Sequence, residues 1–142
     1  MYADYSFYTG EYYGTAIAQA DFPRLATRAS DFLDYYTRGK AAKATDEDIL
    51  AALSKACCAV AEAMKADEDS KKLAEKATEA ALSESGGEVK SETVGSHSVS
   101  YTTAADYIKG SSSSKPLDAR IAYADVAMVY LANTGLLYRG GC

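Results

Sequence analysis

One segment of the sequence, residues 21–38, constrains the fold more than any other. Its apolar side chains recur every three or four residues, which places them along one side of an α-helix. Asp21 can cap the first free N–H groups, and Pro23 fits the first turn of the helix. Gly39 suits the left-handed residue that commonly ends a helix. The apolar positions are Phe22, Leu25, Ala26, Ala29, Phe32, Leu33 and Tyr36. Such a surface does not remain in water, so other segments must pack on it.

The overall composition limits the function classes that need attention. The chain has 142 residues, enough for a single domain with a core, and its net charge of −5 disfavours uniform non-specific binding to nucleic acid. Its three cysteines are Cys57, Cys58 and Cys142, which form no disulfide framework. We see neither a signal peptide nor an apolar run long enough for a membrane span. These observations favour a protein made in a reducing cytoplasm, with no membrane partner.

Further helices are predicted on both sides of the central part of the chain. Thr45 can cap a second helix with an acidic first turn and an end near Lys65. Residues 66–85 have helical composition but a thin apolar stripe, so they either extend this helix or form a separate, solvated one. A last helix is expected over residues 115–134, where apolar side chains repeat in a heptad-like seam. The seam residues are Leu117, Ile121, Ala124, Met128 and Leu131.

The remaining segments are predicted to be extended. Residues 1–20 are rich in Tyr and Gly and indicate an aromatic arm that is not a stable helix. Residues 88–101 alternate in character around Val94, Gly95, Ser96 and His97, which predicts a β-hairpin with its turn at these four residues. Residues 135–142 form a short apolar tail. The predicted fold is therefore mainly α: a single-domain small helical bundle with one β-hairpin and extended N- and C-terminal arms.

Catalytic and metal-binding patterns are weak in this sequence. His97 is the only histidine, and a solvated turn residue is a simpler interpretation than a general base. Cys57 and Cys58 are adjacent on a predicted helix and point about 100° apart, so they cannot face one metal ion together. No phosphate-binding glycine loop occurs. We therefore predict no catalytic residue, no metal site and no cofactor.

Three segments instead indicate interaction with other molecules. The chain holds 12 Tyr, 3 Phe and no Trp, and tyrosine suits half-buried contact surfaces. Each segment also has a simpler explanation: a folded-back arm, a packed hairpin or a docked tail. Taken together, they favour self-assembly or a larger partner. The candidate subunit or tail-side contacts are Tyr5, Phe7, Tyr8, Val94, Gly95, Ser96 and His97, and the candidate anchor residues are Leu136, Leu137, Tyr138 and Arg139.

The order of three segments resembles a known family. DFPRLATRASDFLDYYT, KSETVGSHSVSYTTAADY and YLANTGLLYRG follow one another as in the head–tail connector (adaptor, or head-completion) proteins of long-tailed bacteriophages. The resemblance implies a structural virion protein at the neck, without enzymatic activity, that forms a homo-oligomeric ring of about twelve copies between the portal and a stopper or tail-completion protein. Such a ring extends the channel for double-stranded DNA without sequence-specific binding and serves viral genome ejection.

The resemblance also suggests roles for particular residues, and two other functions remain open. The tail from Leu136 to Arg139 would contact the portal protein, and the unpaired edges of the hairpin could accept strands from neighbouring copies. An acidic channel lining would let DNA slide without sticking. The main alternative is a helical regulatory module that binds a protein partner through its C-terminal helix. A third hypothesis is a small enzyme that uses His97.

Overall fold

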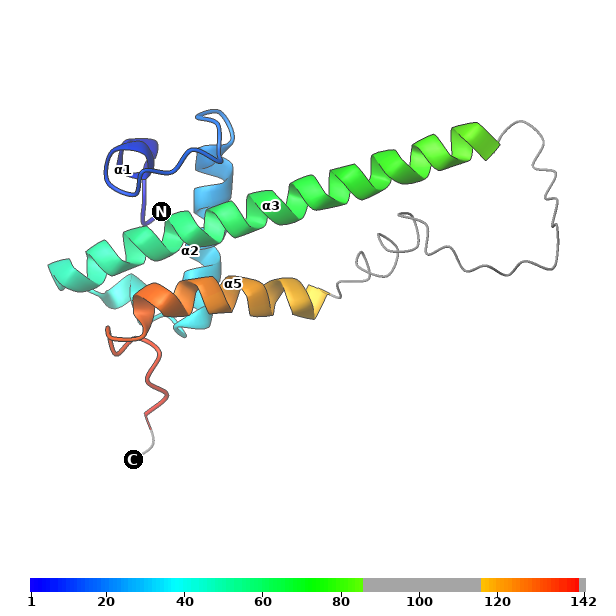
Figure 1. Ribbon diagram of the computed structural model, residues 1–142. Helices are drawn as coiled ribbons and strands as arrows, with labels where there is room; N and C mark the ends of the chain where they lie inside the picture. The colour runs from blue at the N-terminus through cyan, green and yellow to red at the C-terminus, as the bar shows by residue number, and fades with distance from the viewer. Residues whose placement is uncertain (86–115, 141–142) are drawn as a thin grey trace. The chain divides into compact units, whose positions relative to one another are not determined.

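The computed structural model describes residues 1–85 and 116–140, and this part of the chain is mainly helical, as predicted. Its elements are α1 (Tyr5–Gly10), α2 (Phe22–Tyr36), the 3-10 helix η1 (Ala41–Lys43), α3 (Glu47–Ser85) and α5 (Pro116–Leu131) (Figure 1). These residues contain no β-strand. The hairpin predicted over 88–101 lies outside them, together with Val94, Gly95, Ser96 and His97. The chain divides into two compact units, residues 1–67 with 116–142, and residues 68–115.

Helix α2 forms where the apolar stripe predicted it. Its buried side chains include Phe22, Leu25 and Leu33. The predicted cap is wrong, because Asp21 has a helical backbone conformation and makes no capping hydrogen bond; its carboxylate instead lies 4.0 Å from Arg24. Gly39 has the expected left-handed conformation, with a φ of +75°, but the residue directly after the C-cap Thr37 is Arg38, which is also left-handed, with a φ of +55°.

The arm, residues 1–20, is more ordered than the sequence indicated. Asp4 accepts a hydrogen bond from the Phe7 N–H and caps the six-residue helix α1. The ring of Tyr8 is fully buried against Phe22, with 4.8 Å between ring centroids. The prediction of a non-helical arm is therefore wrong over residues 5–10, because long-range packing of Tyr8 stabilises a helix too short to form alone.

Helix α3 is longer than predicted. Asp46, not Thr45, caps it by accepting hydrogen bonds from the N–H groups of Asp48 at 3.0 Å and Ile49 at 3.5 Å. The helix does not end near Lys65 but continues to Ser85; of the two alternatives for residues 66–85, the extension of this helix is the one observed. Its first part, up to Asp67, belongs to the first unit. We call residues 68–85, which belong to the second unit, the α3 extension.

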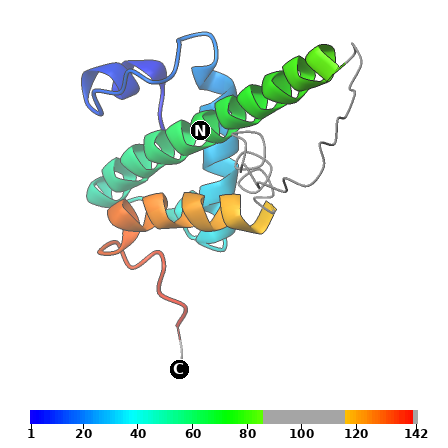
Figure 2. The ribbon, with the colours of Figure 1, turned by 45° about the vertical axis from the view of Figure 1, so that its right-hand side comes forward.

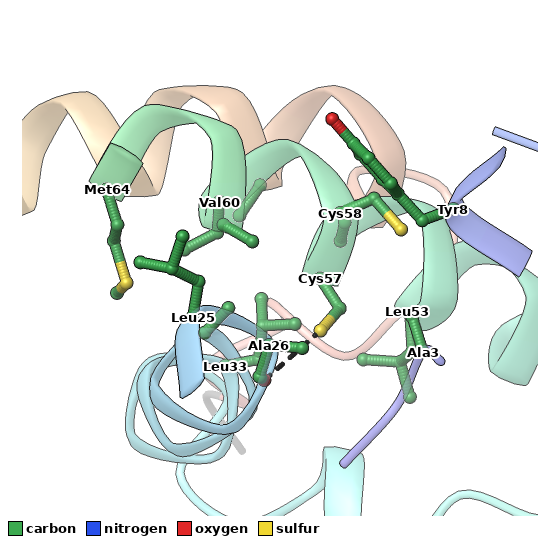
Figure 3. Packing of buried hydrophobic residues seen from close by; sticks show 14 of the residues in the cluster. Ala3, Tyr8, Leu25, Ala26, Leu33, Leu53, Cys57, Cys58, Val60 and Met64 are labelled. Carbon is green, nitrogen blue, oxygen red and sulfur yellow. Dashed lines mark hydrogen bonds between the residues drawn. The ribbon is translucent and has the colours of Figure 1, made fainter. Parts of the chain in front are cut away.

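The core of the first unit lies where the first part of α3 crosses α2 (Figures 1 and 2). Cys57 is fully buried there, and its thiol donates a hydrogen bond to the Ala26 carbonyl at 3.5 Å (Figure 3). Cys58, on the next position of α3, faces Tyr8. Both cysteines are therefore core residues. Other buried members of this cluster are Ala3, Leu25, Leu33, Leu53, Val60 and Met64.

Helix α5 packs beside α3 and α2 in the same unit. The Tyr123 hydroxyl donates to Asp67 at 3.1 Å, and the Tyr123 ring meets Phe32 edge to face at 5.7 Å. Ala127 and Leu131 are fully buried. The predicted heptad seam is not the packed side of this helix. Leu131 lies in the core and Ala124 is half-buried, whereas Ile121 and Met128 are exposed.

Candidate functional site

The arm residues proposed as contacts are mostly committed to this chain's own packing. Tyr8 is 0% exposed, and its hydroxyl accepts hydrogen bonds from the N–H groups of Ala16 at 2.9 Å and Ile17 at 3.1 Å. The same hydroxyl donates to the Glu62 carboxylate at 2.8 Å. Tyr5 and Phe7 are half-buried against the same core. Tyr8 therefore holds the arm on α3 and is not available to a partner.

Glu62 is a hydrogen-bond acceptor for the arm that the sequence interpretation missed. Its carboxylate accepts hydrogen bonds from Tyr8 at 2.8 Å and Tyr12 at 3.4 Å. A signal was present, since Glu62 is the one charged residue between Lys55 and Lys65 on an otherwise apolar stretch of the helix. A carboxylate in such a place needs hydrogen-bond donors from elsewhere in the chain.

The cluster of Tyr8, Tyr12 and Glu62 favours the protonated form of both tyrosines. Burial, the hydrogen bond to Glu62 and the nearby negative charge together raise the pKa of Tyr8 to about 12. Burial and the Glu62 charge also raise the pKa of Tyr12 well above its usual range. Neutral phenols with raised pKa values are hydrogen-bond donors at physiological pH, not bases. Through these hydrogen bonds the cluster joins the arm to α3.

The two core cysteines are also unsuited to nucleophilic chemistry. Burial raises the pKa of the Cys57 thiol, and burial with nearby negative charge raises that of Cys58 to about 12. A reactive cysteine needs the thiolate form and access to solvent, and these two residues have neither at neutral pH.

The C-terminal tail divides into a buried and an exposed part. Leu136 is only 8% exposed and belongs to the core, and Leu137 packs partly against it. Tyr138 is 67% exposed, and Arg139 is also exposed. Of the four proposed anchor residues, therefore, only Tyr138 and Arg139 are presented to another molecule.

A pocket of about 300 Å³ lies between this tail and the turn after α2. The Lys40 ammonium donates a hydrogen bond to the Tyr138 carbonyl and joins the two walls. Arg38 has a φ of +55°, an unusual conformation for a residue with a side chain. We call the 300 Å³ pocket between the tail and the turn after α2 the basic pocket. Its lining residues are Tyr36, Thr37, Arg38, Lys40, Leu136, Leu137, Tyr138, Arg139 and Gly140.

A second surface feature lies on α5. Val129 is 75% exposed, Ile121 52% and Met128 43%; these three residues form what we call the outer face of α5. A shallow groove next to Val129 runs between α5 and α3, where Ala59, Ala63 and Ala66 form its α3 wall. Because the opposite side of α5 is buried in the core, this helix carries apolar side chains on both sides.

Residues 1–85 and 116–140 hold neither a metal-binding cluster nor a membrane-spanning helix. That part of the chain contains no group of three His, Cys, Asp or Glu side chains placed to hold a metal ion. Within the same ranges, none of the helices combines the length and apolar character that crossing a bilayer requires. The candidates His97, Val94, Gly95 and Ser96 are outside the described residues.

Comparisons with known proteins identify no relative. A scan against protein-family models, a search of curated proteins and a search of solved structures each found no match. Any function must therefore be argued from the residues and surfaces described above.

Proposed function

We propose that this chain is a structural subunit of a head–tail connector ring in long-tailed bacteriophages. The observation that carries the proposal is the outer face of α5, where Val129, Ile121 and Met128 are exposed although the other side of the helix is already packed. A helix that is apolar on both sides is normally covered on both sides. In a ring, the neighbouring subunit supplies the second cover. The order of sequence segments that resembles connector proteins supports the same assignment.

Two further features support this role. The exposed Tyr138 and Arg139 side chains end the described tail, and these residue types are enriched at protein interfaces. They are the proposed contact with the portal protein. The net charge of −5 suits a surface along which DNA moves without adhering.

A single-partner helical module is the second candidate, and the same outer face of α5 favours it. A regulatory protein could bind a helix or groove of a different protein there. The two functions differ in stoichiometry: a connector gives a closed ring of many copies on the portal, whereas a module gives a small complex and ignores the portal.

The experiment is to co-express the full chain with the portal protein encoded in its own genome. We expect a complex whose mass by light scattering corresponds to a ring of about twelve copies, as the resemblance implies. A chain that stays monomeric with the portal, and is missing from purified particles, would overturn the proposal.

Surface variants make this experiment specific. Ile121→Ser combined with Val129→Ser should prevent ring formation while the helical circular dichroism is unchanged, because both side chains are exposed. Leu73→Ser is the matched control, since Leu73 is 66% exposed but lies outside α5. Tyr138→Ser, which leaves Arg139 in place, should weaken portal binding alone. Leu136 is retained in every variant because it belongs to the core.

A further inference from the structure

The turn after α1 presents an aromatic side chain in an unfavourable backbone conformation. Tyr13 has a φ of +59° and is 79% exposed. A bulky residue rarely adopts this conformation, and such strain is commonly found at binding sites. Nothing in the packing of the arm explains why residue 13 is a tyrosine, because its ring lies in solvent. Its conformation and exposure together indicate a contact residue for another molecule.

The same turn carries negative charge only. Glu11, the C-terminal cap of α1, is exposed two residues before Tyr13, and the chain contains no Lys or Arg before Arg24. We call residues 11–13 the arm turn. It offers an exposed carboxylate and an exposed aromatic ring two residues apart, and a cluster of cations can bind the first by charge and the second by cation–π attraction.

The basic pocket is such a cluster. Arg38, Lys40 and Arg139 line it, and none of them forms an ion pair with a carboxylate within residues 1–85 and 116–140. The nearest carboxylates in the sequence have other partners: Asp34 accepts a hydrogen bond from Tyr2, and Asp46 caps α3. The three cations are therefore available to an acidic group from outside the chain.

The arm turn and the basic pocket lie on opposite sides of the first unit. Figures 1 and 2 show the arm on one side of α3 and the tail on the other, at the two ends of α2. One chain therefore cannot join its own arm turn to its own basic pocket. Two copies can do so, head to tail, and repetition of such a contact gives a ring when the rotation closes.

We propose that the arm turn of one copy docks in the basic pocket of the next, with Glu11 and the Tyr13 ring placed among Arg38, Lys40 and Arg139. This proposal rests on the ring assembly proposed above and adds a second contact between neighbouring subunits to the one at the outer face of α5. The occupant is a second copy of this chain because the same chain carries both complementary surfaces.

The test is a cross-link between two different single-cysteine chains. Both carry Cys142→Ser, and Cys57 and Cys58 remain because they are buried. One chain carries Thr15→Cys beside the arm turn, and the other carries Ala42→Cys beside the basic pocket; both positions are exposed. With a short bis-maleimide we expect a product from the mixture and little from either chain alone. Asp31→Cys, exposed in the middle of α2, replaces Ala42→Cys as the control.

Charge reversal then tests the chemistry of the contact. Glu11→Lys in the first chain, or Arg38→Glu in the second, should lower the mixed product about tenfold, the effect of one interfacial charge contact. Combining the two reversed chains should restore it. Tyr13→Asn should also lower the product while leaving or raising the thermal midpoint, because Asn tolerates positive φ better. That variant separates association from folding.

Three outcomes overturn the proposal: no mixed product, a product equal to that of the Asp31→Cys control, or a loss that the paired reversals fail to restore. These outcomes are distinct from failure of the connector assignment. A chain that is found in the neck of virions without this cross-link leaves the connector function intact. If the chain forms the cross-link but is absent from virions, the proposed contact stands and the connector function is overturned.

Discussion

The arm and the α3 extension form their structure for opposite reasons. The arm has weak helical propensity, yet Ala3, Tyr8 and Ile17 are at most 5% exposed. The α3 extension is rich in Ala, Glu and Lys, yet Leu73 and Leu82 are 66% and 67% exposed. Tertiary contacts therefore define the arm. The extension is helical because of its composition and because it continues a helix that has already formed, so the cost of nucleation does not recur. Substitutions should separate these two sources of order.

The largest effect is expected from Gly14→Ala in the arm. A Cβ at this position would lie 2.0 Å from Cε2 of Tyr8, so the buried ring or the turn must move. Overpacking of this kind should lower the free energy of unfolding by about 3 kcal/mol. Urea denaturation measures the loss. Gly10→Ala is the matched control, because its Cβ meets nothing within 4 Å; an equal loss there would contradict the packing argument.

Tyr8→Phe should come next, with a loss of about 2 kcal/mol. The change keeps the ring but leaves the N–H groups of Ala16 and Ile17 without their acceptor, and unsatisfied buried donors are costly. The same denaturation measurement applies. Tyr5→Phe serves as the control, since the Tyr5 hydroxyl makes no hydrogen bond to any residue of 1–85 and 116–140. If Tyr8→Phe and Tyr5→Phe lower the free energy of unfolding equally, the hydrogen bonds of the Tyr8 hydroxyl do not stabilise the arm.

Alkaline pH should weaken the arm more gradually. The pKa values of Tyr8 and Cys58 are raised to about 12 in the folded protein, above their ordinary values, so folding favours the protonated forms. Their contribution is complete below about pH 9 and is lost as the pH rises toward 12. The α3 extension contains no Tyr or Cys. Hydrogen exchange across this range should therefore show opening of the arm first, and Tyr8→Phe should flatten the dependence.

The smallest effect is expected in the α3 extension. Leu73→Ala should change the free energy of unfolding by less than about 0.5 kcal/mol, because the side chain is exposed and Ala is a good helix former. The same substitution at Leu53, which is fully buried, should cost about 3 kcal/mol. A large loss at Leu73 in the isolated chain would mean that the extension is held by packing after all.

Sequence reasoning succeeded where order is local and periodic. The stripe of α2 predicted that helix to within two residues, and the left-handed Gly39 followed from its position. It failed where order depends on distant residues. Helix α1 requires Tyr8 to meet Phe22 and Glu62, and no local pattern indicates those contacts. The sequence left the end of α3 open, because a thin apolar stripe does not distinguish a continued helix from a separate one.

The candidate site was predicted less completely than the fold. The exposed half of the tail, Tyr138 and Arg139, was among the chosen residues, whereas Leu136 proved to be a core residue. The arm turn and the basic pocket were missed. Tyr13 and Arg38 adopt positive φ values, and an amino-acid sequence carries no direct sign of such conformations for Tyr or Arg. Their pairing also depends on how α2 separates them in space.

The core that contains Leu136 also contains Ala3, although the two residues stand near opposite ends of the sequence. Building one core from both ends closes a loop that includes nearly the whole polypeptide, and the entropy of that closure is lost before the complete core can stabilise the fold. Helical proteins of this size usually fold rapidly because their contacts are local. Here we expect α2 and the first part of α3 to form an early nucleus, and the last turn of α5 to dock in a slower, final phase that stopped-flow fluorescence of the tyrosines can resolve.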